Sequence, residues 1–284
     1  MLLTAFFLTC AAAIAFMCLG TKASKKWVSH SFYMYGILFT FGSLILLVIN
    51  VQQNENVIRT TIQSIMNRTE MTAEAEPVLT SESRIKDSVH LKAPLIKQLP
   101  ELPRGCEVTS LSMLLGYHGI EINKMELAAK VKKNPRKHKI INDKVHYGNP
   151  HNGFVGDMKS FENPGLGVYH QPIAQLAKEY IDPQLVRDFT GNDFSEIIRQ
   201  LNEKRPVWVI INATYKKLPA KAFMTWQTED GPMKVTRWEH SVLITGYDEK
   251  YIYFNDPLDK TTKAPMQEFK EAWEQMGKQA ITIR

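Results

Sequence analysis

The stretch from Gly105 to His118, Gly-Cys-Glu-Val-Thr-Ser-Leu-Ser-Met-Leu-Leu-Gly-Tyr-His, decides how this chain is expected to fold. Its apolar residues recur at the spacing of one helical face, at Val108, Leu111, Leu114 and Leu115. Gly119 follows where a glycine commonly ends a helix. The pattern therefore predicts a helix that begins at Cys106, directly after a turn.

Cys106 is the only cysteine after residue 51, because Cys10 and Cys18 both lie in an apolar run near the N-terminus. A single cysteine cannot form a disulfide within the domain that carries it. At a helix start, the partial positive charge and the free N–H groups favour a thiolate, and Gly105 leaves room for a substrate backbone. We therefore interpret Cys106 as a reactive thiol, with a buried core cysteine as the alternative.

Outward from this helix, the pattern changes from helices to strands. We predict a short strand at 89–91, helices at 123–133, 172–181 and 194–203, and one long loop at 142–171. Strands are predicted at 207–211, 239–247, 251–254 and 280–283, with a last helix at 266–276. Helices followed by an antiparallel sheet predict an α+β domain over residues 89–284.

His240 differs from the other histidines because it lies within an apolar strand. If the following hairpin turns symmetrically about Asp248, position 240 lies opposite position 256, and Asp256 becomes its cross-strand neighbour. Asn255 then points to the other face, and a register slip of one residue exchanges the two. A nucleophilic cysteine needs a base, and the base needs an orienting group, so His240 and Asp256 are the candidates.

Three more residues are candidates for the same site. The amide of Gln98 is predicted to donate to an oxyanion beside the backbone N–H of Cys106. Glu107 and Trp238, with Gly105, are predicted to contact the substrate, although Glu107 is also ordinary in a first helical turn and Trp238 in a core.

No cofactor is predicted. His146, His151 and Asp157 are the candidates for a metal site, but their spacing matches no familiar ligand set. We therefore predict that no metal is bound and interpret this segment as a loop that borders the substrate groove.

The first 51 residues contain two apolar runs, at 2–19 and 32–51, which are separated by a loop with three lysines. A helix crosses a bilayer with about 20 residues. A cleaved signal peptide is the alternative for the first run, but no positive charge precedes it. We predict a transmembrane hairpin at 1–51 with cytoplasmic lysines, a linker at 52–88, and the domain at 89–284 on the extracytoplasmic side of the cell membrane.

The net charge of +6 does not indicate a nucleic-acid partner. After residue 51, 32 Lys and Arg stand against 29 Asp and Glu, which leaves +3 without a long basic run. A nucleic-acid-binding domain typically gathers its basic residues on one face or along one helix.

Taken together, the motifs resemble one known family. Gln98, Gly105-Cys-Glu-Val-Thr-Ser-Leu111, His240-Ser-Val-Leu-Ile-Thr-Gly-Tyr247 and Asn255-Asp-Pro257 are similar to the bacteriocin-processing, double-glycine-leader cysteine peptidases. The similarity is to stand-alone, membrane-tethered members without an ABC exporter, and it runs from about Val89 to Arg284. It implies a papain-like cysteine peptidase fold, with Cys106 as nucleophile, His240 as base, Asp256 as orienting acid and Gln98 as oxyanion donor.

The resemblance implies a membrane-anchored cysteine peptidase that hydrolyses a peptide or protein substrate through an acyl-enzyme. Because no transporter is fused here, it does not imply cleavage after a Gly-Gly leader, and no export partner is identified. Two alternatives stay open. The same residues could hydrolyse or transfer cell-wall amides, or the scaffold could be a non-catalytic peptide-binding module.

Overall fold

The computed structural model describes residues 2–22, 26–45 and 85–284. Its internal contacts divide the chain into two units, Met1–Ser81 and Glu82–Arg284. The end of the second apolar run and the predicted linker as far as residue 84 lie outside the described residues.

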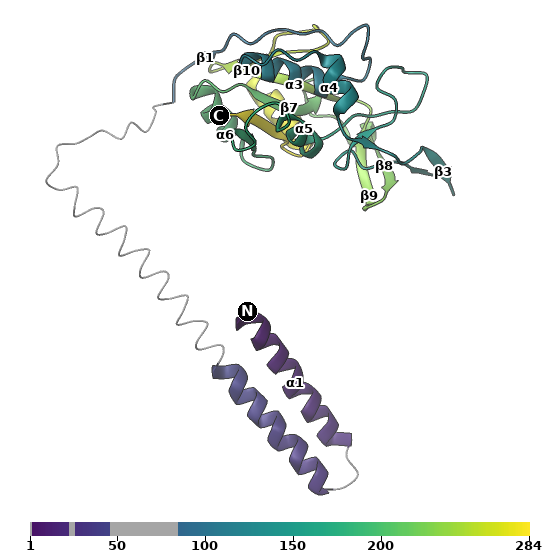
Figure 1. Ribbon diagram of the computed structural model, residues 1–284, viewed down its shortest axis with the longest axis vertical. Coiled ribbons are helices and arrows are strands. Elements are labelled where there is room, and N and C mark those ends of the chain that lie inside the picture. Colours follow the sequence, from purple (N-terminus) through teal and green to yellow (C-terminus); the bar gives the residue numbers. More distant parts are fainter. Residues whose placement is uncertain (1, 23–25, 46–84) are drawn as a thin grey trace, which may run out of the picture. The chain divides into compact units, whose positions relative to one another are not determined.

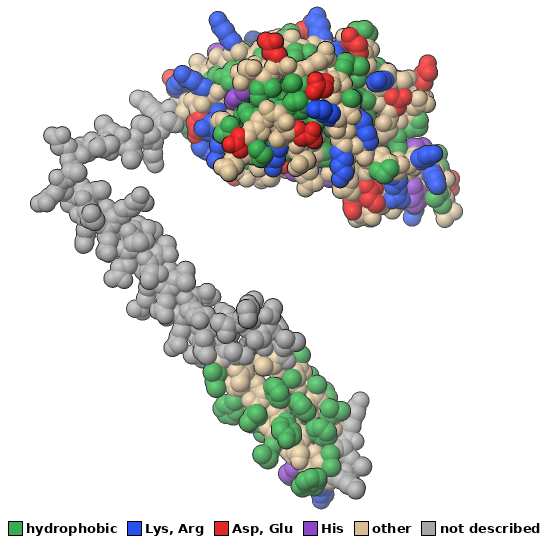
Figure 2. Space-filling model, in the orientation of Figure 1, with side chains coloured by type: hydrophobic (Ala, Val, Ile, Leu, Met, Phe, Trp, Pro, Cys, Tyr) green, Lys and Arg blue, Asp and Glu red, His purple; other side chains and the backbone are tan. Residues whose placement is uncertain are grey.

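The described residues of the first unit form two helices, α1 (Leu2–Lys22) and a helix over residues 26–45. The rings of Phe16 and Phe39 stack with their centroids 5.5 Å apart, and apolar side chains dominate the visible face of both helices (Figure 2). Among the described residues of the whole chain, no helix has the length and apolar character that a membrane crossing requires. The helices lie where the apolar runs are, but the predicted transmembrane hairpin is not supported.

A seven-stranded antiparallel sheet forms the centre of the second unit (Figure 1). Its order is β12 (Lys263–Pro265), β11 (Tyr251–Asn255), β10 (Glu239–Tyr247), β7 (Val207–Asn212), β13 (Ala280–Ile283) and β6 (Val186–Asp188), and β1 (Val89–His90) also pairs with β10.

Helices cover both faces of this sheet because neighbouring residues of a strand point to opposite sides. Trp208 and Ile210 of β7 join one apolar cluster, whereas Val207, Val209 and Ile211 join another. The helices that enter the first cluster are α3 (Cys106–Tyr117), α4 (Lys124–Lys130) and α5 (His170–Ala177). Those that enter the second are α6 (Phe194–Asn202) and α7 (Met266–Gln275).

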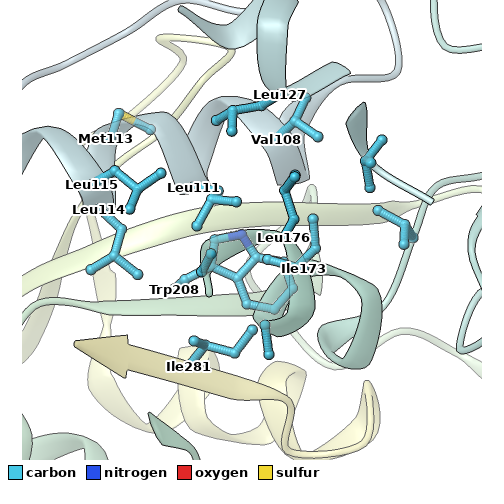
Figure 3. Packing of buried hydrophobic residues seen from close by; sticks show 14 of the residues in the cluster. Val108, Leu111, Met113, Leu114, Leu115, Leu127, Ile173, Leu176, Trp208 and Ile281 are labelled. Atoms are coloured by element: carbon cyan, nitrogen blue, oxygen red, sulfur yellow. The ribbon is translucent and has the colours of Figure 1, made fainter. Parts of the chain in front are cut away.

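Helix α3 is the most deeply buried of these helices, and every residue from Cys106 to Leu115 is buried. Figure 3 shows Leu111 and Leu114 between the helix and the indole of Trp208, with Ile281 beyond it. The indole Nε1 of Trp208 donates to the backbone oxygen of Glu107 at 3.0 Å, and Ser110 Oγ donates to the backbone oxygen of Ser241 at 3.1 Å. These contacts fix the first turn of α3 against β7 and β10.

The segment predicted as one long loop, 142–171, contains strands. A four-stranded sheet consists of β3 (Lys139–Ile141), β4 (Lys144–His146), β8 (Phe223–Thr228) and β9 (Gly231–Thr236), and a 3-10 helix, Ala220–Ala222, precedes β8. In addition, β2 (Lys133–Asn134) pairs in parallel with β5 (Phe154–Val155). The loop prediction was wrong because these short strands form by pairing with residues distant in the sequence, such as Val145 with Trp226.

Replacing Leu111 tests the packing that holds α3. Leu111→Ala should lower the free energy of unfolding by about 2–5 kcal/mol, because the side chain is fully buried and its removal leaves a cavity. Leu95→Ala is the matched control, since Leu95 is 46% exposed, and should cost less than about 1 kcal/mol. Denaturant unfolding followed by tryptophan fluorescence measures both. Equal losses in the two variants would contradict the packing described here.

Candidate active site

Cys106 begins α3, as predicted, and its side chain is buried. Its thiol Sγ lies 3.4 Å from Glu107 Oε2 and donates a hydrogen bond to it. A Cβ on Gly105 would lie 2.5 Å from Leu102 Cβ. The space where a side chain would lie is therefore filled by Leu102, so this close packing requires a glycine, and contact with a substrate backbone stays a prediction.

His240 and Asp256 form a buried pair. The ring Nε2 of His240 lies 2.7 Å from Asp256 Oδ1. The hydroxyl of Tyr215 donates to Asp256 Oδ2 at 2.8 Å, and the backbone N–H groups of Leu258 and Lys260 donate to the same carboxylate. Burial alone would raise the pKa of Asp256, but the hydrogen bond and the charge of His240, with these other donors, hold it below its usual value.

The hairpin brings these two residues together by a route that differs from the predicted one. In the observed register Leu243 pairs with Asn255 and Ile244 with Phe254, so Asp256 is not the cross-strand partner of His240. The register also shifts between Ile244 and Gly246, as at a bulge, which the symmetric turn did not include. Asp256 lies just beyond the end of β11 and reaches His240 from there.

The alternative orienting residue, Asn255, points elsewhere. Its Nδ2 donates to the backbone oxygens of Ala93 and Pro94, at 3.1 and 3.0 Å. Asn255 therefore holds the segment that leads to Gln98, and Asp256 is the residue that contacts His240.

Cys106 and His240 both line one cleft of about 830 Å³. Three large apolar side chains on its wall are exposed, namely Leu99, Phe161 and Trp238. The cleft also carries three basic side chains, Arg104, Arg237 and Lys260. Trp238 thus lines the same cleft as Cys106 and His240, and its contact with a substrate stays a prediction.

Gln98 also lines this cleft and is buried. Its backbone N–H donates to Pro257 at 2.9 Å, which ties it to the segment after Asp256. Its side-chain Nε2 donates to the backbone oxygens of Leu102 and Pro103, at 3.1 and 2.9 Å. Both amide hydrogens are therefore in use, and donation to an oxyanion requires that one of these bonds be given up.

Two acidic side chains lie beside the thiol. Glu107 is fully buried, and a carboxylate oxygen of Glu107, one of Glu239 and Cys106 Sγ all lie within 4.8 Å of one another. Burial raises the pKa of Glu107 to about 7, and burial together with Glu107 raises that of Glu239 well above its usual value. Glu107 is fully buried and does not line the cleft, so the structure does not place it in contact with a substrate.

These surroundings overturn the predicted direction of the thiol pKa. Burial, followed by the charges of Glu107 and Glu239, raises the pKa of Cys106 well above its ordinary value. The helix N-terminus contributes only about 0.3–1 kcal/mol, which is less than one pKa unit. In this arrangement Cys106 is a protonated thiol.

Metal binding fits these residues poorly. Within the described part of the chain, Cys106, Glu107 and Glu239 are the one set of acidic, cysteine or histidine residues close enough to ligate an ion together. Metal ligands must be deprotonated, whereas burial favours the protonated form of all three. His146 lies on β4, and the ring of His151 contacts Tyr169 and His170, so the structure does not gather these histidines with Asp157 into a metal site.

Sequence reasoning missed Tyr215 and Glu239. Tyr215 follows β7 and carries no motif, so nothing in the sequence marks it as a partner of Asp256. Glu239 could have been found from strand alternation, because it shares a face of β10 with Ser241 and Leu243, and Leu243 lies in the cluster that contains α3.

A cysteine at a helix N-terminus, with a histidine and an aspartate supplied by an antiparallel sheet, defines the papain-like class of α+β folds. Residues 90–281 match the model of the Peptidase_C39 like family, and the chain belongs to this family.

The chain is also similar to individual proteins. The uncharacterised protein YvpB of Bacillus subtilis (strain 168) is 45% identical over 186 residues, which cover 65% of this chain and 71% of that protein. A crystal structure from Bacillus anthracis, provisionally assigned as a C39-like peptidase, is 44% identical with a TM-score of 0.65, and the match covers 70% of this chain and 98% of that one. A double glycine motif protease from an AMS/PCAT transporter, in complex with the leader peptide, is 16% identical with a TM-score of 0.34, over 69% of this chain and 95% of that one, too weak a likeness to argue from.

Replacing Glu107 tests the pKa of its carboxyl group. The folded-state pKa of about 7 exceeds the ordinary 4.5, so the folded chain keeps a proton that the unfolded chain releases. Stability from this group is therefore greatest below about pH 4.5 and falls as the pH rises to about 7.

Glu107→Gln removes that loss. At pH 8 it should gain roughly 1–3 kcal/mol relative to the native chain, with little gain near pH 4.5. Thermal unfolding at the two pH values measures the difference. A gain of the same size at both would show that the carboxyl group titrates normally.

Proposed function

We propose that this protein is a cysteine peptidase in which Cys106, His240 and Asp256 hydrolyse peptide bonds. The observation that carries the proposal is that Cys106 and His240 line one cleft while Asp256 holds the far nitrogen of the His240 ring. Membership of a peptidase-like family supports the same activity.

Asp256 leaves one nitrogen of His240 for the reaction. Because Nε2 is engaged by Asp256, Nδ1 is the atom that accepts the thiol proton. Sγ, which faces Glu107 in this structure, first turns toward the cleft. It then attacks the carbonyl carbon, His240 returns the proton to the leaving amine as the C–N bond breaks, and water hydrolyses the thioester.

The negative oxygen of the tetrahedral intermediate needs donors. The first N–H groups of a helix have no partner within it, so the N–H of Cys106 is one candidate. Gln98 is the second, and its amide reaches an oxyanion by releasing Leu102 or Pro103.

An open cleft with exposed Phe161 and Trp238 suits an extended peptide with large apolar side chains. No described feature favours a cell-wall amide or a non-catalytic role over this, and both remain outcomes of the experiments below. The location of the domain on the extracytoplasmic side of a cell membrane stays a prediction from the sequence.

Removing the thiol is the direct test of the activity. Cys106→Ala should lower the cleavage rate of peptides by about 10³-fold or more, because the nucleophile is lost. Mass spectrometry of an unstructured peptide mixture measures it. The matched control is the double variant Cys10→Ser with Cys18→Ser, which should keep native activity. If the Cys106→Ala variant binds peptides but the native chain cleaves none, the peptide-binding alternative replaces the proposal.

Asp256 is tested by a change that keeps its shape. Asp256→Asn should lower kcat by about 10²–10⁴-fold with little change in KM, because the ring of His240 loses its charged partner and its preferred tautomer. Asn255→Ala, the adjacent control, should stay within about tenfold of native. Steady-state kinetics on one fluorogenic peptide compares them. If Asn255→Ala lost more activity than Asp256→Asn, the orienting role would belong to Asn255 and not to Asp256.

A further inference from the structure

The carboxyl group of Glu107 lies beside the nucleophile and beside Glu239, a half-buried acid that lines the cleft. Its Oε1 accepts the backbone N–H of Val168 at 2.6 Å, and its Oε2 accepts the thiol of Cys106 at 3.4 Å. Glu107 thus holds the thiol in the orientation that the structure shows, with Sγ bound to a carboxylate and not to His240.

The carboxyl group of Glu239 lies close to both Glu107 and the thiol. A Cβ on Gly167 would lie 2.1 Å from Glu107 Oε1 and 2.6 Å from Glu239 Oε2, so the two carboxyl groups flank the same glycine. Glu239 Oε1 is buried and has no hydrogen-bond partner among the described residues. Two carboxylates this close disfavour each other's ionisation, and only Glu107 is fully buried, so each raises the pKa of the pair.

Neighbouring charged and titratable groups do little to offset the raised pKa of the two acids. Tyr169 and Cys106 lie near it, and a nearby cation is Lys133, whose ammonium donates to the backbone oxygen of Ala128 at 2.6 Å. Burial is the largest influence on the pKa of Glu107, and the charge of Lys133 is the smallest of those named. The charge state of Glu107 therefore depends mainly on its own burial.

We propose that Glu107 is a positioning residue that holds Cys106 as a resting thiol when ionised and releases it to His240 when protonated. This rests on the proposed function. The ionised carboxylate accepts the S–H bond and repels a thiolate, whereas the neutral acid, which takes its proton from solvent, is a weaker acceptor and does not repel the thiolate. The charge of Glu107 repels a thiolate at Sγ, which contacts the carboxylate directly, and it attracts an imidazolium at His240. We take the repulsion to be the larger effect, so ionisation of Glu107 shifts the proton from His240 back to sulfur.

The consequence is an unusual pH dependence. An ordinary thiol reacts faster as the pH rises. Here the reactivity of Cys106 should fall about tenfold between about pH 6 and pH 8 as Glu107 ionises, before it rises again in strong alkali.

The experiment measures the alkylation rate of Cys106 by iodoacetamide in the full chain from pH 5 to pH 9, with mass spectrometry to separate Cys106 from Cys10 and Cys18. Glu107→Gln keeps a carbonyl for Val168 and is always neutral, so it should abolish the fall and raise the rate at pH 8 about tenfold. Glu121→Gln, an exposed residue with the same change of charge, should keep the native profile.

A native rate that rises steadily with pH overturns the proposal, even if Glu107→Gln fails to fold. A native fall that persists in Glu107→Gln also overturns it, since another group then titrates. Because alkylation needs no peptide, these results are separate from the peptidase assay: a chain with the expected profile that cleaves no peptide refutes the proposed function and leaves the role of Glu107 standing.

Discussion

The burial of the first turn of α3 is the constraint on which the rest of the site depends. Every residue from Cys106 to Leu115 is buried, so this helix has no solvent face over its first ten residues. The indole of Trp208 binds the Glu107 backbone oxygen, which fixes the turn against the central sheet. In a surface helix the first-turn acid would lie in water, where it would stabilise the helix N-terminus and would not contact the cysteine. Here the acid must lie inside, next to the thiol.

The sequence was most informative where an element is long and its burial pattern is strong. Strands β10 and β13 begin and end where the pattern predicts, because each is an almost fully buried run rich in apolar and β-branched residues. Strands β4 and β8 were not predictable, since Val145 gains a partner only when Trp226 folds beside it. Such short strands carry no internal signal, and their preference comes from the neighbours they acquire.

The same distinction applies to the site. Cys106, His240 and Asp256 were selected from the sequence. In the structure His240 and Asp256 are in contact, and Cys106 and His240 line one cleft. The predicted hairpin register was wrong because the shift near Gly246 depends on the sheet. The pKa direction of the thiol was wrong for a reason of size: burial can shift a pKa by 3–5 units, several times what a helix terminus supplies.

The three acids of the site, Glu107, Glu239 and Asp256, differ in pKa because they receive different hydrogen-bond donors. Asp256 accepts bonds from His240, Tyr215 and two backbone N–H groups, and these outweigh its burial and keep it ionised. Glu107 accepts one backbone N–H and a weak S–H donor, and one oxygen of Glu239 accepts nothing among the described residues. Environments that push like groups apart in pKa assign them different roles. In the roles proposed above, the carboxylate that orients an imidazole has many donors, while the acid that changes charge near neutral pH has few. The stability that burial of Glu107 costs above neutral pH is then linked to its proposed response to pH.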